Sequence, residues 1–329
     1  MKALIYEGPE ELALRDAPDP VPEAGQQLIK VGAVGICGSD MHAYLGHDER
    51  RPAPLILGHE AAGLIVGGDR AGERVTLNPL VTCGTCKACT SGHDNLCADR
   101  MIISMPPREG AFAQFVTMRD ENLVTVPDHV SLEKASLTEP IACGWHAVRL
   151  AKERLGPGSY TALVIGGGAI GLGAALSLVA QGIHDITIVE PNALRRRYLI
   201  DKCRQNTVSP DDLNADMMFD IVIDGVGYAA TRATASAHAR PGGVIAHIGL
   251  GEGTGGLDIR RMTLQEITFI GTYTYTARDF RDTAQAIFDG RLGPLDWTET
   301  RPLADGPAAF SDIRAGRMPA PKIILHPHP

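Results

Sequence analysis

The sequence predicts an α/β protein of two domains, one small and β-rich, the other built around a doubly wound parallel sheet. Three observations predict this architecture. The chain has 329 residues, more than a single hydrophobic core usually serves. Its first third is rich in short apolar runs broken by Gly and Pro. From about Thr161 the pattern changes to strand, Gly-rich turn, helix and strand, which is a βαβ unit.

The β-rich domain is predicted from four short apolar runs in the first part of the chain. Their length and the turn residues between them are typical of strands. Most of the Cys and His residues of this part lie in the loops between the runs. The expected strands are residues 27–34, 63–67, 74–77 and 113–117.

The parallel-sheet domain is predicted from five further apolar runs. Such runs are typical of a parallel sheet that is covered on both faces. A Gly-rich turn at 166–171 and a helix at 172–181 join the first run to the second. The expected strands are residues 162–165, 186–190, 219–224, 244–249 and 267–271.

The end of the sequence predicts a return to the first domain. Residues 277–290 have the pattern of an amphipathic helix, and residues 322–325 form another short apolar run. We expect this last strand to join the β-rich domain, so that the parallel-sheet domain is inserted within it. The predicted boundaries are 1–145 with 278–329 for the β-rich domain and 146–277 for the parallel-sheet domain.

Charge and composition exclude several classes of partner. The formal net charge of −8 gives no basic surface of the kind that neutralises phosphates, so we exclude nucleic acids and anionic membranes. No apolar run reaches the roughly twenty residues that a membrane-spanning helix needs. The N-terminus enters a strand-like pattern without a long apolar signal region. We therefore expect a cytoplasmic protein.

The turn at 166–171 fits the pattern G-x-G-x-x-G between a strand and a helix, the context in which this pattern indicates a dinucleotide site. The first glycine makes the tight turn, the second lets the backbone approach a pyrophosphate, and the third lets the helix pack closely on the strand. The helix N-terminus then faces the phosphates. The expected cofactor-binding residues of the turn are Gly166, Gly168, Ala169, Ile170 and Gly171.

Glu190 ends the next strand, where a carboxylate accepts hydrogen bonds from the adenosine ribose hydroxyls. Its charge also repels a 2′-phosphate, so NAD is favoured over NADP. Arg195, Arg196 and Arg197 follow one or two helical turns later. A solvated helix face is one interpretation of these arginines; the alternatives are that they recruit a phosphate or that Arg195 covers the adenine.

Four of the 7 cysteines lie within residues 83–97, with the spacing C-x2-C-x2-C-x7-C. In a reducing compartment this spacing indicates metal binding rather than disulfides. Four thiolates close the tetrahedral shell of a zinc ion and leave no open position, so such a site is structural. An iron–sulfur cluster is the alternative, but the Cys-Pro ending of a ferredoxin run is absent. The expected ligands are Cys83, Cys86, Cys89 and Cys97.

A second set of metal-ligating residues is more dispersed. Cys37 lies in Gly-Ile-Cys-Gly-Ser-Asp, and His59 and Glu60 lie in Leu-Gly-His-Glu. One thiolate and one imidazole beside a carboxylate suit zinc, and so few protein ligands leave a position for water or substrate. The alternative is a buried thiol and a core histidine without a metal.

These motifs occur together and in order, and with them the chain resembles the zinc-dependent medium-chain alcohol dehydrogenases over essentially its whole length. Thr-Glu-Pro at 138–140, followed by Ile-Ala-Cys-Gly-Trp-His-Ala-Val at 141–148, is most similar to the sorbitol, polyol and sugar-acid dehydrogenase branch. The resemblance implies a GroES-like β-rich catalytic domain and a Rossmann coenzyme domain. In this branch the Glu of Glu-Pro is near or on the catalytic metal, whereas the ethanol-oxidising branch uses a Cys of the same region.

Carried over position by position, the resemblance gives Cys37 and His59 as catalytic zinc ligands. Glu60 and Glu139 become the carboxylates that ligate the metal directly, through water, or alternately. Cys143 is the alternative to Glu139.

Polar residues near these ligands take supporting roles by the same resemblance. Asp40 orients His59 through its second ring nitrogen. Ser39 passes the substrate proton outward, and His42 is the candidate next member of this relay, a plain surface histidine being the alternative. Lys322 matches a basic position near the catalytic lobe.

The implied activity is that of a zinc-dependent, NAD-linked dehydrogenase that oxidises a secondary alcohol of a polyol, sugar acid or related small hydroxy compound to a ketone. Two zinc ions per subunit, one catalytic and one structural, and a homodimer or homotetramer are expected. The alternatives are a threonine or simple secondary-alcohol dehydrogenase and, in another class, a catalytically silent NAD-binding sensor. Tyr44, Trp145, Tyr273 and Tyr275 are candidates to line the substrate pocket, with packing as the alternative role.

Overall fold

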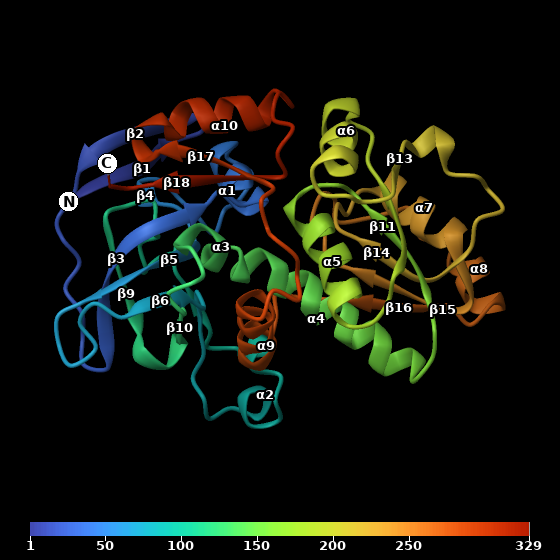
Figure 1. The fold of residues 1–329 in the computed structure, drawn as a ribbon, viewed down its shortest axis with the longest axis horizontal. Coiled ribbons are helices and arrows are strands. Elements are labelled where there is room, and N and C mark those ends of the chain that lie inside the picture. Colours follow the sequence, from blue (N-terminus) through green and yellow to red (C-terminus); the bar gives the residue numbers. More distant parts are fainter. Residues whose placement is uncertain (329) are drawn as a thin grey trace.

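The computed structural model describes residues 1–328, which form two halves joined by helices (Figure 1). The first half is rich in strands and includes both the beginning of the chain and the last strand. The strands of this half are β1 (Lys2–Gly8), β2 (Glu11–Asp16), β3 (Gln26–Gly35), β4 (Leu55–Ile56), β5 (Glu60–Val66), β6 (Arg74–Leu77), β7 (Leu80–Val81), β8 (Met101–Ile102), β9 (Phe115–Arg119), β10 (Leu123–Thr125), β17 (Thr298–Pro302) and β18 (Lys322–His326).

The main sheet of this half has the strand order β10-β6-β5-β3-β18-β17, and β9 also pairs with β3. Along β3, buried Ile29 and Val31 flank exposed Lys30, the period-two pattern of a strand with one covered face. The runs predicted as strands correspond to β3, β5, β6 and β9. The run predicted near the end of the chain is β18, which pairs with β3 and β17.

Short helices cover the strands of this half and build its lobes. The four-cysteine loop contains α2, and the 3₁₀ turn Asp94–Leu96 lies just before its last cysteine. The helices are α1 (Gly38–Tyr44), α2 (Lys87–Thr90), α3 (Leu132–Ser136) and α10 (Gly306–Arg314). Further 3₁₀ turns of this half occupy Asp120–Asn122 and Leu303–Asp305, and one in the other half occupies Pro210–Asp212.

The second half is a parallel sheet between helices. Its strands are β11 (Thr161–Ile165), β12 (Asp185–Val189), β13 (Thr207–Val208), β14 (Phe219–Asp224), β15 (Ala239–His247) and β16 (Thr268–Gly271), and its helices are α5 (Ala169–Ala180), α6 (Ala193–Asp201), α7 (Ala229–His238) and α8 (Ile259–Leu264).

The strand order of this second sheet is β13-β12-β11-β14-β15-β16, with every pair parallel. The chain therefore reverses its direction of travel across the sheet between β11 and β14. In doubly wound sheets the ligand crevice lies at this reversal, outside the carboxyl ends of the strands. The five predicted strands are present; β13 was not predicted, because two residues carry no periodic signal.

Two helices connect the halves: α4 (Thr138–Leu155) and α9 (Ala277–Phe288). In Figure 1, α4 runs from the β-rich half to the parallel-sheet half. Gly144 of α4 faces α5 so closely that a Cβ atom on it would lie 2.6 Å from Ala174 Cα. The predicted domain boundaries fall within α4 and at the start of α9, and they stay a prediction.

The largest hydrophobic core is continuous across both halves. It includes Ala33 and Ile324 from the β-rich sheet, Val164 and Ile188 from the parallel sheet, and both tryptophans of the chain, Trp145 and Trp297. Within residues 1–328, no helix has the length and apolar character that crossing a membrane requires.

Candidate active site

The four predicted structural ligands converge in one lobe. The Sγ atoms of Cys86 and Cys89 are 3.5 Å apart, those of Cys83 and Cys97 are 3.5 Å apart, and those of Cys83 and Cys89 are 3.9 Å apart. A tetrahedron with zinc–sulfur distances near 2.3 Å has sulfur atoms about 3.8 Å from one another. The distances are far longer than the roughly 2.05 Å of a disulfide. The donor set and its spacing fit a zinc ion.

Backbone N–H groups favour the thiolate form of Cys83 in this lobe. Hydrogen bonds from Thr85 and Cys86 lower the pKa of Cys83 to about 6, and Cys86 N lies 3.3 Å from Cys83 Sγ. Thiolates are the form that binds metal, so this effect favours Cys83 as a ligand, whereas burial raises the pKa of Cys89 to about 11.

A second group of possible ligands consists of Cys37, His59 and Glu60, whose ligand atoms lie within 4.8 Å of one another. Cys37 follows β3 and forms the N-cap of α1, while His59 and Glu60 lie at the beginning of β5. β3 and β5 are antiparallel neighbours, and Gly35 is paired with Glu60. The sheet register therefore brings the two sequence motifs together.

The imidazole of His59 is surrounded by polar partners. Asp40 Oδ1 lies 3.4 Å from His59 Nδ1, and Ser104 Oγ lies 3.4 Å from the same nitrogen. Ser39 Oγ lies 3.5 Å from Nε2. Burial opposes the charged imidazole, but Asp40 and Cys37 raise the pKa of His59 well above its ordinary value. The group thus favours positive charge at this point, which is what a metal cation brings.

Glu60 is paired with a cation from the far end of the chain. Lys322 Nζ lies 2.6 Å from both carboxylate oxygens of Glu60 and donates to Ile36 O at 2.8 Å. Burial lowers the pKa of Lys322, but the adjacent Glu60 charge outweighs it, so the pKa is raised overall. The pair has almost no solvent contact, since the two side chains are 2% and 0% exposed.

Glu139 and Cys143 lie one helical turn apart on α4, beside the three-residue group but outside the set that shares the 4.8 Å limit. Burial raises the pKa of Glu139 to about 7; His59 opposes this and Glu60 adds to it. Tyr275 Oη donates to Glu139 Oε1 at 2.7 Å. Burial likewise raises the pKa of the Cys143 thiol well above its ordinary value, with Glu139 adding to it.

The Gly-rich turn has the backbone that its glycines predict. Gly166 has φ 97°, in the left-handed region, and Gly168 is the N-cap of α5. A Cβ atom on Gly171 would lie 1.8 Å from Gly166 O, so helix and strand approach too closely for a side chain. At Gly168 the nearest atom to a Cβ would be Arg195 Nη1, at 3.9 Å. The turn therefore leaves open backbone at the N-terminus of α5, along Ala169 and Ile170, which fits a phosphate group.

Glu190 and Arg195 both face this turn. Glu190 Oε2 accepts from Gly167 N and Oε1 accepts from Asn192 N, each at 2.8 Å. Arg195 Nη2 donates to Met318 O at 3.0 Å, and burial lowers the pKa of Arg195 against the opposing charge of Glu190. Its Nε is buried without a hydrogen-bond partner among residues 1–328.

The neighbouring arginines point elsewhere. Arg196 Nη1 donates to the backbone oxygens of Glu190 and Pro191, and Arg197 is exposed. His42 lies on α1, but among the contacts found within residues 1–328 none joins its side chain to Ser39 or His59.

Sequence reasoning missed Ser104 as a partner of His59, and it named Tyr275 as a candidate for the substrate pocket or for packing, not as a partner of Glu139. Ser104 is fully buried and has φ 66°, yet a lone serine in an irregular loop carries no distinguishing pattern. For Tyr275 the only available signal was its place just after the last strand of the parallel sheet, at the edge where ligands bind.

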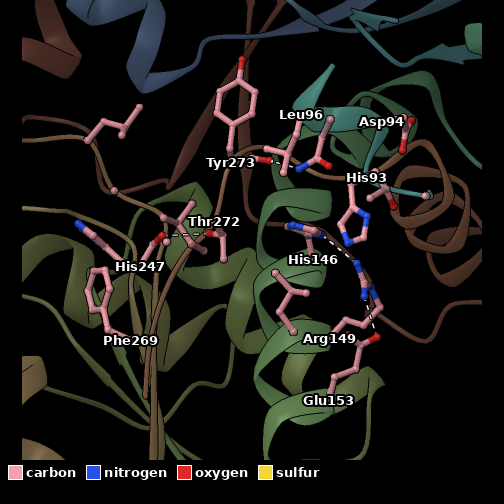
Figure 2. Close-up of a pocket in the computed structure, with 18 of the residues that line it drawn as sticks. His93, Asp94, Leu96, His146, Arg149, Glu153, His247, Phe269, Thr272 and Tyr273 are labelled. Atoms are coloured by element: carbon pink, nitrogen blue, oxygen red, sulfur yellow. Dashed lines mark hydrogen bonds and ion pairs between the residues drawn. The ribbon is translucent and has the colours of Figure 1, made fainter. Parts of the chain in front are cut away.

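A cleft of about 1220 Å³ separates the four-cysteine lobe from the parallel sheet (Figure 2). His93, Asp94 and Leu96 line it on the lobe side, and His247 and Phe269 line it on the sheet side. Cys37, His59 and Glu60 are not among its lining residues. The group of possible metal ligands therefore does not line this cleft.

Comparison with known proteins agrees with this geometry. The alcohol dehydrogenase GroES-like domain matches residues 23–128, and the zinc-binding dehydrogenase domain matches residues 169–289. Sorbitol dehydrogenase of Bacillus subtilis (strain 168) is 36% identical over 268 residues, 76% of this chain and 75% of its own. L-galactonate-5-dehydrogenase of Escherichia coli (strain K12) is 30% identical over 307 residues, 89% of this chain and 88% of its own.

A solved structure extends the similarity to three dimensions. Acetophenone reductase from Geotrichum candidum NBRC 4597, determined in complex with NAD, matches with a TM-score of 0.87 at 26% identity, covering 99% of this chain and 96% of that one. The predicted family and fold class are confirmed. The chain belongs to the zinc-dependent medium-chain alcohol dehydrogenases, in the branch of polyol and sugar-acid dehydrogenases.

Proposed function

We propose that this enzyme oxidises a secondary alcohol of a polyol or sugar acid to a ketone and reduces NAD. One observation carries the proposal: the ligand atoms of Cys37, His59 and Glu60 lie within 4.8 Å of one another. Three ligands leave an open position, and a second carboxylate, Glu139, is buried beside them. The sorbitol and L-galactonate relatives support a polyhydroxylated substrate.

Two zinc ions per subunit belong to this proposal. Cys83, Cys86, Cys89 and Cys97 hold the structural ion, and Cys37, His59 and Glu60 hold the catalytic one. Glu139 would bind the catalytic ion through a water molecule or only during part of the turnover. Cys143 is the alternative candidate for this position. Bound at the catalytic position, zinc supplies the Lewis acidity that lowers the pKa of a substrate hydroxyl.

Residues of the chain transfer the proton that the substrate hydroxyl loses. Ser39 Oγ, 3.5 Å from His59 Nε2, accepts the proton that the substrate hydroxyl loses and passes it outward, with His42 as the next member of the relay. Asp40 fixes the orientation of His59 through Nδ1. Lys322 balances the charge of Glu60, so that the buried group does not accumulate negative charge.

The turn from Gly166 to Gly171 would hold NAD, and bound there NAD would supply the hydride acceptor. The open N-terminus of α5 receives the pyrophosphate. Glu190 favours NAD over NADP because its carboxylate accepts from ribose hydroxyls and repels a 2′-phosphate. Arg195, which lies over Gly168, covers the adenosine side of the site.

The enzyme is proposed to act as a cytoplasmic homodimer or homotetramer. Two features support an oligomer: β16 is an edge strand of the parallel sheet, and large apolar side chains nearby are exposed. These side chains are Leu250, Ile259 and Leu264. A second copy is the occupant that we propose for this face.

The test combines a metal count with a substrate screen. Purified protein is analysed by atomic emission and assayed for NAD reduction with polyols, aldonates, threonine and simple alcohols. Two zinc ions per subunit and the highest kcat/KM on a polyol or aldonate are expected. One zinc ion and no turnover identify the silent NAD-binding form instead, and a preference for threonine or a simple alcohol contradicts the substrate class.

A variant checks the assignment of the open metal site. Cys37→Ser should abolish turnover while NADH binding, followed by fluorescence titration, stays nearly intact. Comparable turnover in Cys37→Ser would contradict the role proposed for this thiolate.

A further inference from the structure

The carboxylate of Glu139 is held from a distant part of the chain. Tyr275 Oη lies 2.7 Å from Glu139 Oε1. Both side chains are buried, 1% and 6% exposed, and the ring of Tyr275 packs against Phe280 with centroids 5.6 Å apart. Within residues 1–328, no other hydrogen bond reaches this carboxylate. Tyr275 therefore determines the direction in which Glu139 presents its second oxygen.

Tyr275 belongs to a linking segment, residues 272–276, between β16 and α9. The backbone is strained next to it: Thr274 has φ 47°, in the left-handed region that β-branched residues avoid. Thr274 Oγ1 is also buried without a hydrogen-bond partner among the described residues. Such a conformation persists only where the surroundings over-determine it. Contacts with neighbouring elements, rather than the intrinsic backbone preference of its residues, therefore hold the segment in this conformation.

The four-cysteine lobe forms hydrogen bonds to the linking segment and the start of α9, on both sides of Tyr275. Asn95 Nδ2 donates to Tyr273 O at 2.7 Å, and Asp94 Oδ2 accepts from Ala277 N at 2.9 Å. Asn95 is only 3% exposed. Both lobe residues lie in the stretch between the third and fourth cysteines, so the folded lobe fixes their positions.

The parallel sheet and α4 anchor the rest of the segment. Thr272 donates to His247 O through its N–H at 2.9 Å and through Oγ1 at 3.0 Å. Thr276 caps α9 and bonds Asp279, whose carboxylate also contacts His146 of α4. The segment thus connects the four-cysteine lobe and the parallel sheet to the carboxylate of Glu139.

We propose that Tyr275 is a positioning residue for Glu139, and that the four-cysteine lobe keeps Tyr275 in place through Asn95 and Asp94. This inference rests on the proposed function, in which Glu139 acts beside the catalytic zinc. The lobe itself touches no reacting group. The zinc-bound fold of the lobe fixes the positions of Asn95 and Asp94. These two residues hold the linking segment through hydrogen bonds, and the segment, through Tyr275, fixes the orientation of the Glu139 carboxylate.

Removing one hydroxyl tests the first step. Tyr275→Phe keeps the ring against Phe280 and deletes only the hydrogen bond to Glu139. We expect the purified holoenzyme variant to release its catalytic zinc to a chelating dye roughly 10- to 100-fold faster than wild type, the size of a lost outer-shell partner. The visible spectrum of the cobalt(II)-substituted enzyme should shift as well.

Tyr160→Phe is the matched control, because among the described residues its hydroxyl bonds only to Leu155 O and Gly156 O in the other half. It should release zinc like the wild type. Wild-type zinc release and an unchanged cobalt spectrum in Tyr275→Phe would overturn the proposal.

The step from the lobe is tested by a double-mutant cycle. Asn95→Ala should speed release of the catalytic zinc several-fold in the wild-type background and hardly at all in Tyr275→Phe, because both changes act through one contact. If Asn95→Ala speeds zinc release by the same factor in the wild-type and Tyr275→Phe backgrounds, the proposed role of the lobe is overturned. Lys87→Ala, an exposed change on α2, is the control within the lobe. If Asn95→Ala does not fold, Asn95→Asp removes the donor and keeps the shape.

The two proposals fail in distinguishable ways. A wild-type protein that binds zinc but reduces NAD with no alcohol contradicts the proposed function, whereas zinc release and the cobalt spectrum still measure whether Tyr275 positions Glu139.

Discussion

The two carboxylates beside Cys37 and His59 are held with unequal strength. Glu60 is paired with the full charge of Lys322 at 2.6 Å, while Glu139 receives one neutral hydroxyl donor at 2.7 Å. Charge-assisted hydrogen bonds are roughly twice as strong as neutral ones. Glu139 is therefore the carboxylate that moves more easily, which suits a ligand that binds and leaves the metal during turnover.

At residue scale, Glu190→Gln tests cofactor discrimination. The amide keeps only one acceptor oxygen, so either Gly167 N–H or Asn192 N–H loses its partner, and the charge that repels a 2′-phosphate is removed. We expect the ratio of kcat/KM for NAD over NADP to fall about tenfold, equivalent to about 1.4 kcal/mol. Asp185→Asn, an exposed change at the start of β12, the strand that ends just before Glu190, should leave the ratio unchanged. An unaltered ratio in Glu190→Gln counts against the assignment.

How far single residues were predictable depends on how much chemistry their type carries. Cysteine and histidine at ligand spacing have few other uses, so Cys37, His59 and the four-cysteine set stood out. Ser104 and Tyr275 reach the site from loops 45 and 136 residues away from their partners. A serine or tyrosine in a loop serves many purposes, and only the folded chain brings Ser104 to His59 and Tyr275 to Glu139.

At the scale of elements, two glycines of the G-x-G-x-x-G turn have different roles: Gly171 allows close packing of helix and strand, and Gly168 leaves room for the cofactor. Gly171→Ala places a Cβ atom 1.8 Å from Gly166 O, so the turn must distort. A loss of about 3 kcal/mol or more in the free energy of unfolding is expected. Gly168→Ala meets no atom closer than 3.9 Å and should keep the stability while raising KM for NAD at least about tenfold.

Urea unfolding and steady-state kinetics on the two glycine variants check this separation. If Gly168→Ala destabilises the fold as much as Gly171→Ala, the open backbone at the helix N-terminus is structural rather than a cofactor site.

The contact between α4 and α9 predicts a dependence of stability on pH. Asp279 is fully buried and lies 2.7 Å from both His146 Nδ1 and Arg149 Nε. Burial opposes ionisation, but these partners hold the pKa of Asp279 well below its ordinary value. A depressed carboxyl pKa stabilises the fold above the unfolded value, about 3.9, and this contribution is lost as the pH falls through the folded value.

Asp279→Asn should therefore lower the free energy of unfolding by about 3 kcal/mol at pH 7, since it leaves the half-buried guanidinium of Arg149 without its counter-charge. The difference from wild type should shrink below about pH 4. Urea titrations at pH 7, 5 and 3 measure it, with Asp282→Asn on the exposed side of α9 as the control. A difference that stays constant over this range contradicts the electrostatic origin.

For the molecule as a whole, the shared core predicts cooperative unfolding. Trp145 and Trp297 lie in the cluster that spans both halves. Their fluorescence therefore reports the same packing that holds the two sheets together. We expect the urea transitions followed by tryptophan fluorescence and by far-UV circular dichroism to coincide. Separate midpoints would show that the halves unfold independently despite the common core.

The arrangement of the sheets was predictable to a different degree in each half. Long apolar runs between helical patterns identified five strands of the parallel sheet, because strands buried on both faces are apolar throughout. β17 was missed, since Thr298–Pro302 is a polar, partly exposed edge strand without alternation. The boundary at residue 145 has no sequence signal, because it falls within the unbroken helix α4.

The position of β18 has a consequence for how the enzyme is made. This strand pairs with β3, and its Lys322 neutralises Glu60, although 262 residues separate the two side chains. On the ribosome, β3 and β5 emerge long before β18, which is synthesised only after the whole parallel-sheet half. Until then Glu60 has no buried counter-charge, and burying an unpaired carboxylate is strongly unfavourable. The ligand group therefore matures late in biosynthesis, when the cofactor-binding half is already present.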